Sequence, residues 1–121
     1  MKDLQDIALR AKASLCIEYN LEGVRYVEQF IEDYRSLPNI TLDDKKDSAL
    51  FLGSYLGECI IHNYGGEWST DKELNLVCVR FDEKNCVFPL TKTLKQLQNG
   101  KEDSVYEFYR AIPLLFKLDR G

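Results

Sequence analysis

Three polar side chains spaced four residues apart are the first group in this sequence that could do chemistry. Glu58 is the only formal charge between residues 48 and 61, with Ser54 and His62 four residues before and after it. On a helix these three share one face, where a carboxylate beside an imidazole can serve as general acid and base. A buried carboxylate can instead hold a fold together by accepting hydrogen bonds from an arginine, from the Trp68 indole or from backbone amides. We expect this structural role for Glu58 and keep the acid and base role as the alternative.

A thiol adjoins this carboxylate, but the sequence does not assemble a nucleophile or a metal site around it. Cys59 and His62 are three residues apart on one expected helix, a spacing that rarely gives attack geometry, and no third residue is evident to orient the base. The four cysteines and one histidine include no C-x-x-C or H-x-x-x-H pair that could begin a zinc site. We expect reduced, buried thiols at Cys16, Cys59, Cys78 and Cys86. We therefore predict no catalytic residue, no metal and no cofactor.

A row of small residues accompanies the polar group along the same segment. Ala49, Gly53, Gly57 and Ile61 are spaced four residues apart and end in a larger side chain. Such a row lets another backbone or a large aromatic ring approach a helix closely. The glycine pair at 65–66 leads from a helix into a strand, whereas phosphate-binding glycine loops lead from a strand into a helix. We expect close packing from the row and no phosphate site from the pair.

The first part of the chain has helical patterns. Apolar spacing predicts helices over 3–19, 21–36 and 42–64. The third is expected to be the central buried helix, because apolar or small residues surround it on nearly every side. Thr41 or Asp43 can cap its start, and the glycine pair at 65–66 can end it.

After residue 66 the pattern changes to short strands and then returns to helices. Strands are expected over 67–70, 74–81 and 86–88, and further helices over 91–98 and 104–117. Pro89 should end the last strand because it cannot donate to a ladder. Pro113 should kink or shorten the last helix, whose inner face includes Leu115. The elements predict an α+β fold of about five helices packed around a small two- or three-stranded antiparallel meander.

Composition and charge limit the classes of partner. The chain has 121 residues, of which 45% are hydrophobic and 30% charged, as in one ordinary globular domain over 1–121. Its net charge of −4 argues against a nucleic acid or an anionic membrane as the main partner and suits a basic protein. Residues 18–73 hold twelve acidic and five basic side chains, so the acidity is concentrated there.

The acidic segment also carries tyrosines, which suit an interface. Tyrosine is common in interfaces because its ring buries well while its hydroxyl stays wet. The expected second helix carries Glu22, Glu28, Glu32 and Asp33, and an acidic loop follows at 43–47. These side chains could accept a basic partner, or they could simply be a solvated face.

Two motifs carry a resemblance to a bacterial family. Residues 53–58 read G-S-Y-L-G-E and residues 65–68 read G-G-E-W. They resemble a group of small uncharacterised bacterial domains in which a G-x-Y-x-G-E helix leads to a G-G-x-W turn. The segments 23–31 and 87–104 are similar to flanking parts of the same group, so the resemblance covers about residues 21–112. It implies a bacterial cytoplasmic domain, and by analogy an immunity or accessory factor encoded beside toxin or secretion genes.

Together these observations favour a non-enzymatic, cytoplasmic protein-binding module, such as an immunity or accessory protein for a bacterial toxin or secretion system. The N-terminus lacks a secretory signal, and no apolar stretch is long enough to span a bilayer. The expected binding residues are Glu28, Glu32, Asp33, Glu58, His62 and Trp68. The expected partner is a basic protein such as a toxin, without nucleic acid or membrane, and the chain is a monomer or a homodimer. The alternative function is a small-molecule-binding protein or hydrolase that uses Glu58 and His62, and a third possibility is a purely structural homodimer.

Overall fold

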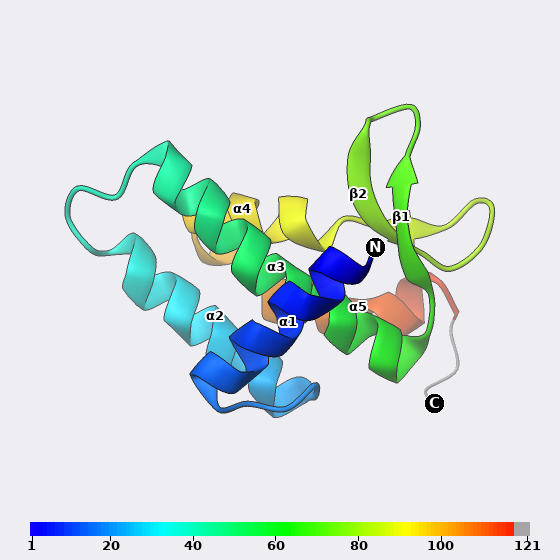
Figure 1. Ribbon diagram of the computed structural model, residues 1–121, viewed down its shortest axis with the longest axis horizontal. Coiled ribbons are helices and arrows are strands. Elements are labelled where there is room, and N and C mark those ends of the chain that lie inside the picture. Colours follow the sequence, from blue (N-terminus) through cyan, green and yellow to red (C-terminus); the bar gives the residue numbers. More distant parts are fainter. Residues whose placement is uncertain (118–121) are drawn as a thin grey trace.

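The computed structural model describes residues 1–117 of the chain. Within that range it contains five α-helices, a short 3₁₀ helix and one antiparallel sheet of strand order β1-β2-β3. In chain order the elements are α1 Lys2–Leu15, α2 Leu21–Arg35, α3 Leu42–Tyr64, β1 Glu67–Asp71, β2 Leu76–Arg80, β3 Cys86–Val87, α4 Pro89–Asn99, η1 Lys101–Asp103 and α5 Val105–Leu115. The helices form the larger part of the molecule, and the β1-β2 hairpin stands beside the C-terminal end of α3 (Figure 1). The predicted α+β class, with its antiparallel meander, is confirmed.

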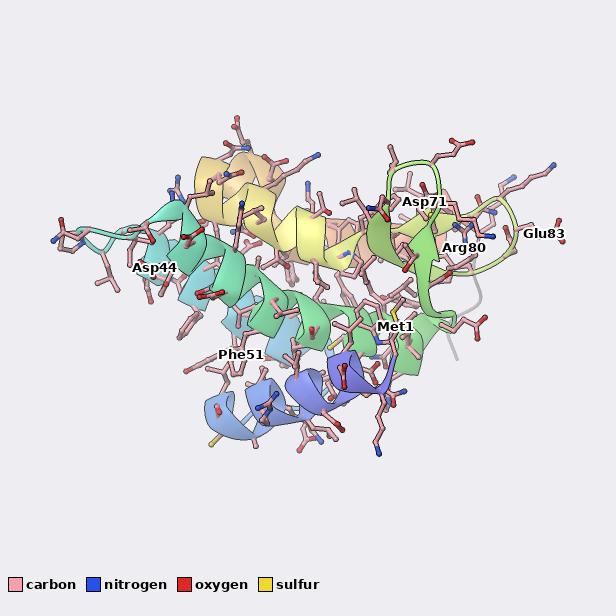
Figure 2. All side chains as sticks on the ribbon, turned by 45° about the horizontal axis from the view of Figure 1, so that its top comes forward. Met1, Asp44, Phe51, Asp71, Arg80 and Glu83 are labelled. Carbon is pink, nitrogen blue, oxygen red and sulfur yellow. The ribbon has the colours of Figure 1, made fainter. Side chains whose placement is uncertain are left out.

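Helix α3 is the central element, as its sequence predicts. All residues from 52 to 60 are buried. The helix lies between α1 on one side and α4 on the other, with Phe51 on the side facing α1 (Figure 2). A capping box begins it, in which the Asp44 N–H donates to Thr41 Oγ1 over 3.1 Å and the Thr41 N–H donates to Asp44 Oδ2 over 3.0 Å. Gly65, with φ of 92°, ends it. Both predicted ends are therefore confirmed.

Helix α1 is shorter than its apolar pattern predicts. It ends at Leu15, and Cys16 takes a left-handed conformation with φ of 56°. The Ile17 N–H reaches back to the Lys12 carbonyl over 3.1 Å, which closes the helix in the manner of a Schellman motif. The predicted continuation to Tyr19 is wrong because the chain must turn here to begin α2, where the Asn20 side chain accepts the Gly23 N–H over 2.8 Å. Residues 16–20 form the α1–α2 connector.

The C-terminal helices differ from their predicted ranges, most at the start of α4 and at the end of α5. Pro89 stops the β3 ladder and is also the first residue of α4, where its missing N–H costs no hydrogen bond. Helix α4 therefore begins two residues before the predicted start of 91. In α5, Ile112 is buried but Leu115 is 72% exposed, so its predicted inward position is wrong. Phe116 makes the final contact instead, with its ring centroid 5.4 Å from that of Phe81.

The sheet packs through its middle strand. In the register of β1 and β2, Trp68 lies opposite Val79 and Ser69 lies opposite Cys78. Cys78 and Val79 are consecutive and both fully buried, so both faces of β2 are covered at this point. No helix within residues 1–117 is both long and apolar enough to cross a membrane.

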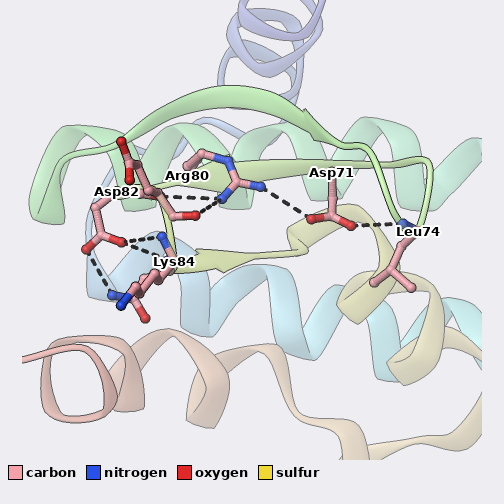
Figure 3. Close-up of polar contacts among 7 residues, drawn as sticks. Asp71, Leu74, Arg80, Asp82 and Lys84 are labelled. Atoms are coloured by element: carbon pink, nitrogen blue, oxygen red, sulfur yellow. Dashed lines mark hydrogen bonds and ion pairs between the residues drawn. The ribbon is translucent and has the colours of Figure 1, made fainter.

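The turn between β2 and β3 is closed by one carboxylate. Asp82 Oδ1 accepts the Lys84 and Asn85 N–H groups, each over 2.8 Å, and Asp82 Oδ2 accepts Asn85 Nδ2 over 2.9 Å. Beside it, the Arg80 guanidinium lies 3.3 Å from Asp71 Oδ1 (Figure 3). The polar groups of this turn are thus engaged with one another.

These bonds predict the acid behaviour of the turn. The Asn85 side chain, the Lys84 N–H and the other donors hold the pKa of Asp82 below its ordinary value of about 3.8. Because the folded-state pKa is the lower one, Asp82 stabilises the fold fully above pH of about 3.8, and this contribution is lost as the pH falls through the folded-state pKa. A carbon-13 NMR titration of the Asp82 carboxyl should give a midpoint below 3.8, which rises in Asn85→Ala. An unchanged midpoint in Asn85→Ala would contradict this assignment.

Candidate functional site

Glu58 is held inside the molecule by the indole of Trp68. Trp68 Nε1 donates to Glu58 Oε2 over 2.6 Å, and the Glu58 side chain is 7% exposed. The indole is one of the three kinds of donor that the sequence analysis names for this carboxylate. A hydrogen bond to an ionised acceptor is short and strong, so the bond ties β1 to the C-terminal half of α3.

The small-residue row allows this contact. A Cβ at Gly57 would lie 2.0 Å from Trp68 Cη2, so only glycine leaves room for the ring. One turn earlier, a Cβ at Gly53 would lie 2.7 Å from the Cα of Leu90 on α4. The prediction that this row admits another backbone or a large aromatic ring is confirmed, by the backbone of Leu90 at Gly53 and by the Trp68 ring at Gly57.

His62 lies one turn beyond Glu58, at the rim of the same site. Its Nε2 is 3.5 Å from Glu58 Oε1, and its side chain is 54% exposed. The imidazole packs against Tyr19, with ring centroids 4.6 Å apart. The buried carboxylate and the α1–α2 connector therefore orient the imidazole from two sides.

Tyr19 brings the connector into the site. Its hydroxyl is buried and has no hydrogen-bond partner within residues 1–117. Burial, followed by the charge of Glu58, raises the pKa of Tyr19 to about 12, so the phenol keeps its proton at neutral pH. On the ring face, Lys12 Nζ lies 5.1 Å from the Tyr19 centroid, and it pairs with Glu18 Oε2 over 3.0 Å.

These side chains line an open pocket between α1, the connector and α3. Its volume is about 600 Å³, and its lining consists of Gln5, Leu9, Lys12, Glu18, Tyr19, Glu58 and His62. We name it the Glu58 pocket. The four-residue spacing of Glu58 and His62 predicts that they lie together, but the pocket residues from α1 and the connector are not predicted. The apolar spacing of α1 continues through residue 19, so periodicity alone does not indicate that the chain turns back at Cys16.

The candidate nucleophiles do not reach this pocket. Ser54 is fully buried, its hydroxyl has no partner among the described residues, and it does not line the pocket. Cys59 is also fully buried, and burial raises the pKa of its thiol to about 12. The arrangement offers a carboxylate, an imidazole and a phenol for binding, without an activated serine or thiol on the described part of the chain.

The acidic residues of α2 divide into inner and outer sets. Glu28 accepts the Ser104 hydroxyl, and it also accepts the Tyr106 N–H over 3.0 Å. Glu32 Oε2 accepts Gln96 Nε2 over 3.0 Å. These two carboxylates connect α2 to α4 and α5. Helix α2 contributes no lining residue to the Glu58 pocket.

The outer set forms a continuous stripe along α2. Asp33 is exposed and accepts Gln29 Nε2 over 2.9 Å. Other exposed side chains lie on the same face of the helix as Asp33. One of them is Tyr26, which is 50% exposed. We name this set the α2 stripe: Glu22, Tyr26, Gln29 and Asp33. It places acidic and aromatic side chains on the exposed face of α2.

Comparisons with protein-family models, curated proteins and solved structures found no match to this chain. Over residues 1–117, no group of three or more His, Cys, Asp and Glu side chains is arranged to hold a metal ion. What the α2 stripe and the Glu58 pocket do must therefore be inferred from their own chemistry.

Proposed function

We propose that this chain is a non-enzymatic protein-binding module that recognises a basic partner protein through the α2 stripe. The observation that carries this proposal is the alignment of Glu22, Tyr26 and Asp33 on one exposed helical face. A half-exposed tyrosine among carboxylates offers a rigid ring to bury and negative charge to steer a basic surface.

The remainder of α2 supports this use of its outer face. Because Glu28 and Glu32 are bonded to α5 and α4, the helix is anchored from behind. A binding surface on an anchored helix loses little conformational entropy when the partner docks. Glu28 and Glu32 therefore support the α2 stripe, whereas Asp33 belongs to the contact surface itself.

The biological setting of the proposal comes from the resemblance of residues 53–58 and 65–68 to small bacterial domains. We assign the chain the role of an immunity or accessory protein for a bacterial toxin or secretion system, acting in the cytoplasm. Its partner is a basic protein such as a toxin, rather than a nucleic acid or a membrane. The net charge of −4 supports that choice.

The proposal predicts the effect of charge reversal on the α2 stripe. The partner is first identified by mild affinity purification of the tagged chain from its host, counting only proteins near one-to-one stoichiometry. Glu22→Lys/Asp33→Lys should then weaken its binding by about tenfold or more and slow association most at low salt. Both side chains are exposed, so the melting temperature should change little.

A matched variant controls for net charge. Asp6→Lys/Glu73→Lys changes the charge equally at exposed positions outside the α2 stripe and should bind like the unmodified protein. Equal binding by the Glu22→Lys/Asp33→Lys variant and the unmodified protein would show that the proposed surface is wrong.

A second candidate function is small-molecule binding at Glu58 and His62, and the observation that favours it is the Glu58 pocket. Binding is better supported there than hydrolysis. Glu58 is already engaged by the Trp68 indole, and neither Ser54 nor Cys59 lines the pocket.

A further inference from the structure

We propose that the Glu58 pocket binds a primary ammonium group carried on an aliphatic stem. This inference rests on the second candidate function, small-molecule binding at Glu58 and His62, and is independent of the α2 stripe. It follows from the charge, the free acceptors and the shape of the pocket.

The first reason is the charge of Glu58. Its side chain is 7% exposed, and within residues 1–117 no lysine or arginine nitrogen lies within 4.0 Å of it. Its polar contacts there are the neutral Trp68 indole and the His62 imidazole. A buried carboxylate is stable when it is paired and hydrogen-bonded. A ligand cation at the Glu58 end of the pocket would pair with this carboxylate when His62 is neutral.

The second reason is the set of free acceptors. Glu58 Oε1 has only His62 Nε2 near it, at 3.5 Å, and the Tyr19 hydroxyl oxygen has no partner in the described chain. An ammonium group has three N–H donors and no acceptor. It can therefore donate to Glu58 Oε1, and its other donors remain for water or for Glu18, whereas the buried Tyr19 hydroxyl is not exposed to the pocket.

The third reason distinguishes ammonium from guanidinium and from anions. Trp68 already donates to Glu58 Oε2 over 2.6 Å, so Oε1 keeps the greater free capacity to accept, which favours a ligand that needs one carboxylate oxygen over a guanidinium fork. An ammonium is a compact point charge that needs only one such oxygen. The charged groups of the lining are Glu18, Glu58 and Lys12, which leave one excess negative charge when His62 is neutral. A monovalent cation balances that charge, and an anion would be repelled by Glu58.

The fourth reason is the wall of the pocket. Leu9 is 55% exposed at its rim, and the Tyr19 ring forms part of the lining. Lys12 already rests its own ammonium over the Tyr19 ring and against Glu18, so this wall accommodates an alkylammonium group. The volume of about 600 Å³ leaves room for a second one at the Glu58 end.

Nuclear magnetic resonance titration of the nitrogen-15-labelled full chain tests the site. The two probes are n-butylammonium, a free amine, and Nα-acetyl-lysine N-methylamide, which represents a lysine side chain of a protein. The uncharged controls are 1-butanol and Nα-acetyl-norleucine N-methylamide. Both ammonium probes should give saturable shifts at Tyr19, Glu58 and His62, and the controls should not. A lysine probe that binds about tenfold tighter identifies a protein lysine as the natural occupant, whereas equal affinity identifies a free amine.

Variants complete the test. Glu58→Gln keeps the shape and an acceptor for Trp68 but removes the charge, so the affinity should fall about tenfold or more. Leu9→Lys places a competing cation at an exposed rim position and should weaken binding even if Glu58→Gln does not fold. Glu73→Gln, outside the pocket, should bind like the unmodified chain. Equal shifts with the uncharged controls, or undiminished binding by folded Glu58→Gln, would overturn the proposal and leave the α2 stripe unaffected.

Discussion

Replacing Gly57 by alanine is expected to lower the free energy of unfolding by about 3 kcal/mol. The new Cβ would lie 2.0 Å from Cη2 and 2.3 Å from Cζ2 of Trp68, distances that no side chain tolerates. The ring must therefore leave its place on α3. When it leaves, its 2.6 Å bond to Glu58 breaks, and a buried carboxylate loses its best donor.

A double-mutant cycle separates this clash from other effects of alanine. Urea unfolding is measured for Gly57→Ala, Trp68→Ala and the double variant. Once the ring is absent, Gly57→Ala should cost nothing and should gain up to about 1 kcal/mol from the better helix propensity of alanine. Gly65→Ala is a useful comparison, because its Cβ meets nothing within 4 Å and only its φ of 92° opposes the change. An equal cost of Gly57→Ala with and without Trp68 would contradict the clash.

The parts of the fold that the sequence predicts well are those set by local chemistry. Helix α3 begins at the Thr41 cap and ends at Gly65, because a side-chain acceptor and a residue tolerant of positive φ are needed at those two points. The Trp68 contact is also predictable in kind. A lone carboxylate beside a row of small residues indicates that a bulky side chain with a hydrogen-bond donor packs close to the helix. The Trp68 indole, ten residues after Glu58, is such a side chain.

The connector shows what local chemistry cannot predict. Residues 16–19 continue the apolar spacing of α1, yet the helix stops at Leu15. Besides the local cap at Asn20, a contact far away in the chain holds this turn, because the Tyr55 hydroxyl donates to the Glu18 carbonyl over 2.5 Å. A Cβ at Gly23 would lie 2.4 Å from the same carbonyl oxygen, so the start of α2 also depends on this turn. Five of the seven residues that line the Glu58 pocket come from α1 and this connector, and their place in it could not be predicted from periodicity.

The acidic residues of α2 also have partners that local sequence does not predict. These partners decide which residues should be changed in a binding experiment. Glu28 and Glu32 have the sequence character of a solvated face, but their partners are Tyr106 and Gln96, 78 and 64 residues away in the chain. Reversing their charge would remove part-buried hydrogen bonds between helices as well as negative charge. A loss of partner binding in such variants would report unfolding and contact together, whereas the exposed Glu22 and Asp33 report contact alone.

Gln96→Leu is therefore expected to be among the most destabilising changes outside the apolar core, at about 3 kcal/mol. Gln96 is fully buried, its Oε1 accepts the Val105 N–H over 2.8 Å and its Nε2 donates to Glu32 over 3.0 Å. Leucine fills a similar volume but leaves the first N–H of α5 and a carboxylate of α2 without these partners. Each buried polar group left unpaired costs about 1–3 kcal/mol.

Gln98→Leu is the matched control, since Gln98 lies two residues away on the same helix and is exposed. Urea unfolding should place it within about 0.5 kcal/mol of the unmodified chain. Similar small losses for both variants would mean that the Gln96 bridge contributes little. If the bridge is as strong as expected, Gln96→Leu should reduce partner binding only by as much as it reduces the fraction of folded protein. Glu22→Lys/Asp33→Lys should weaken binding while the chain stays folded, which would separate the carboxylates that hold α2 in place from those that meet the partner.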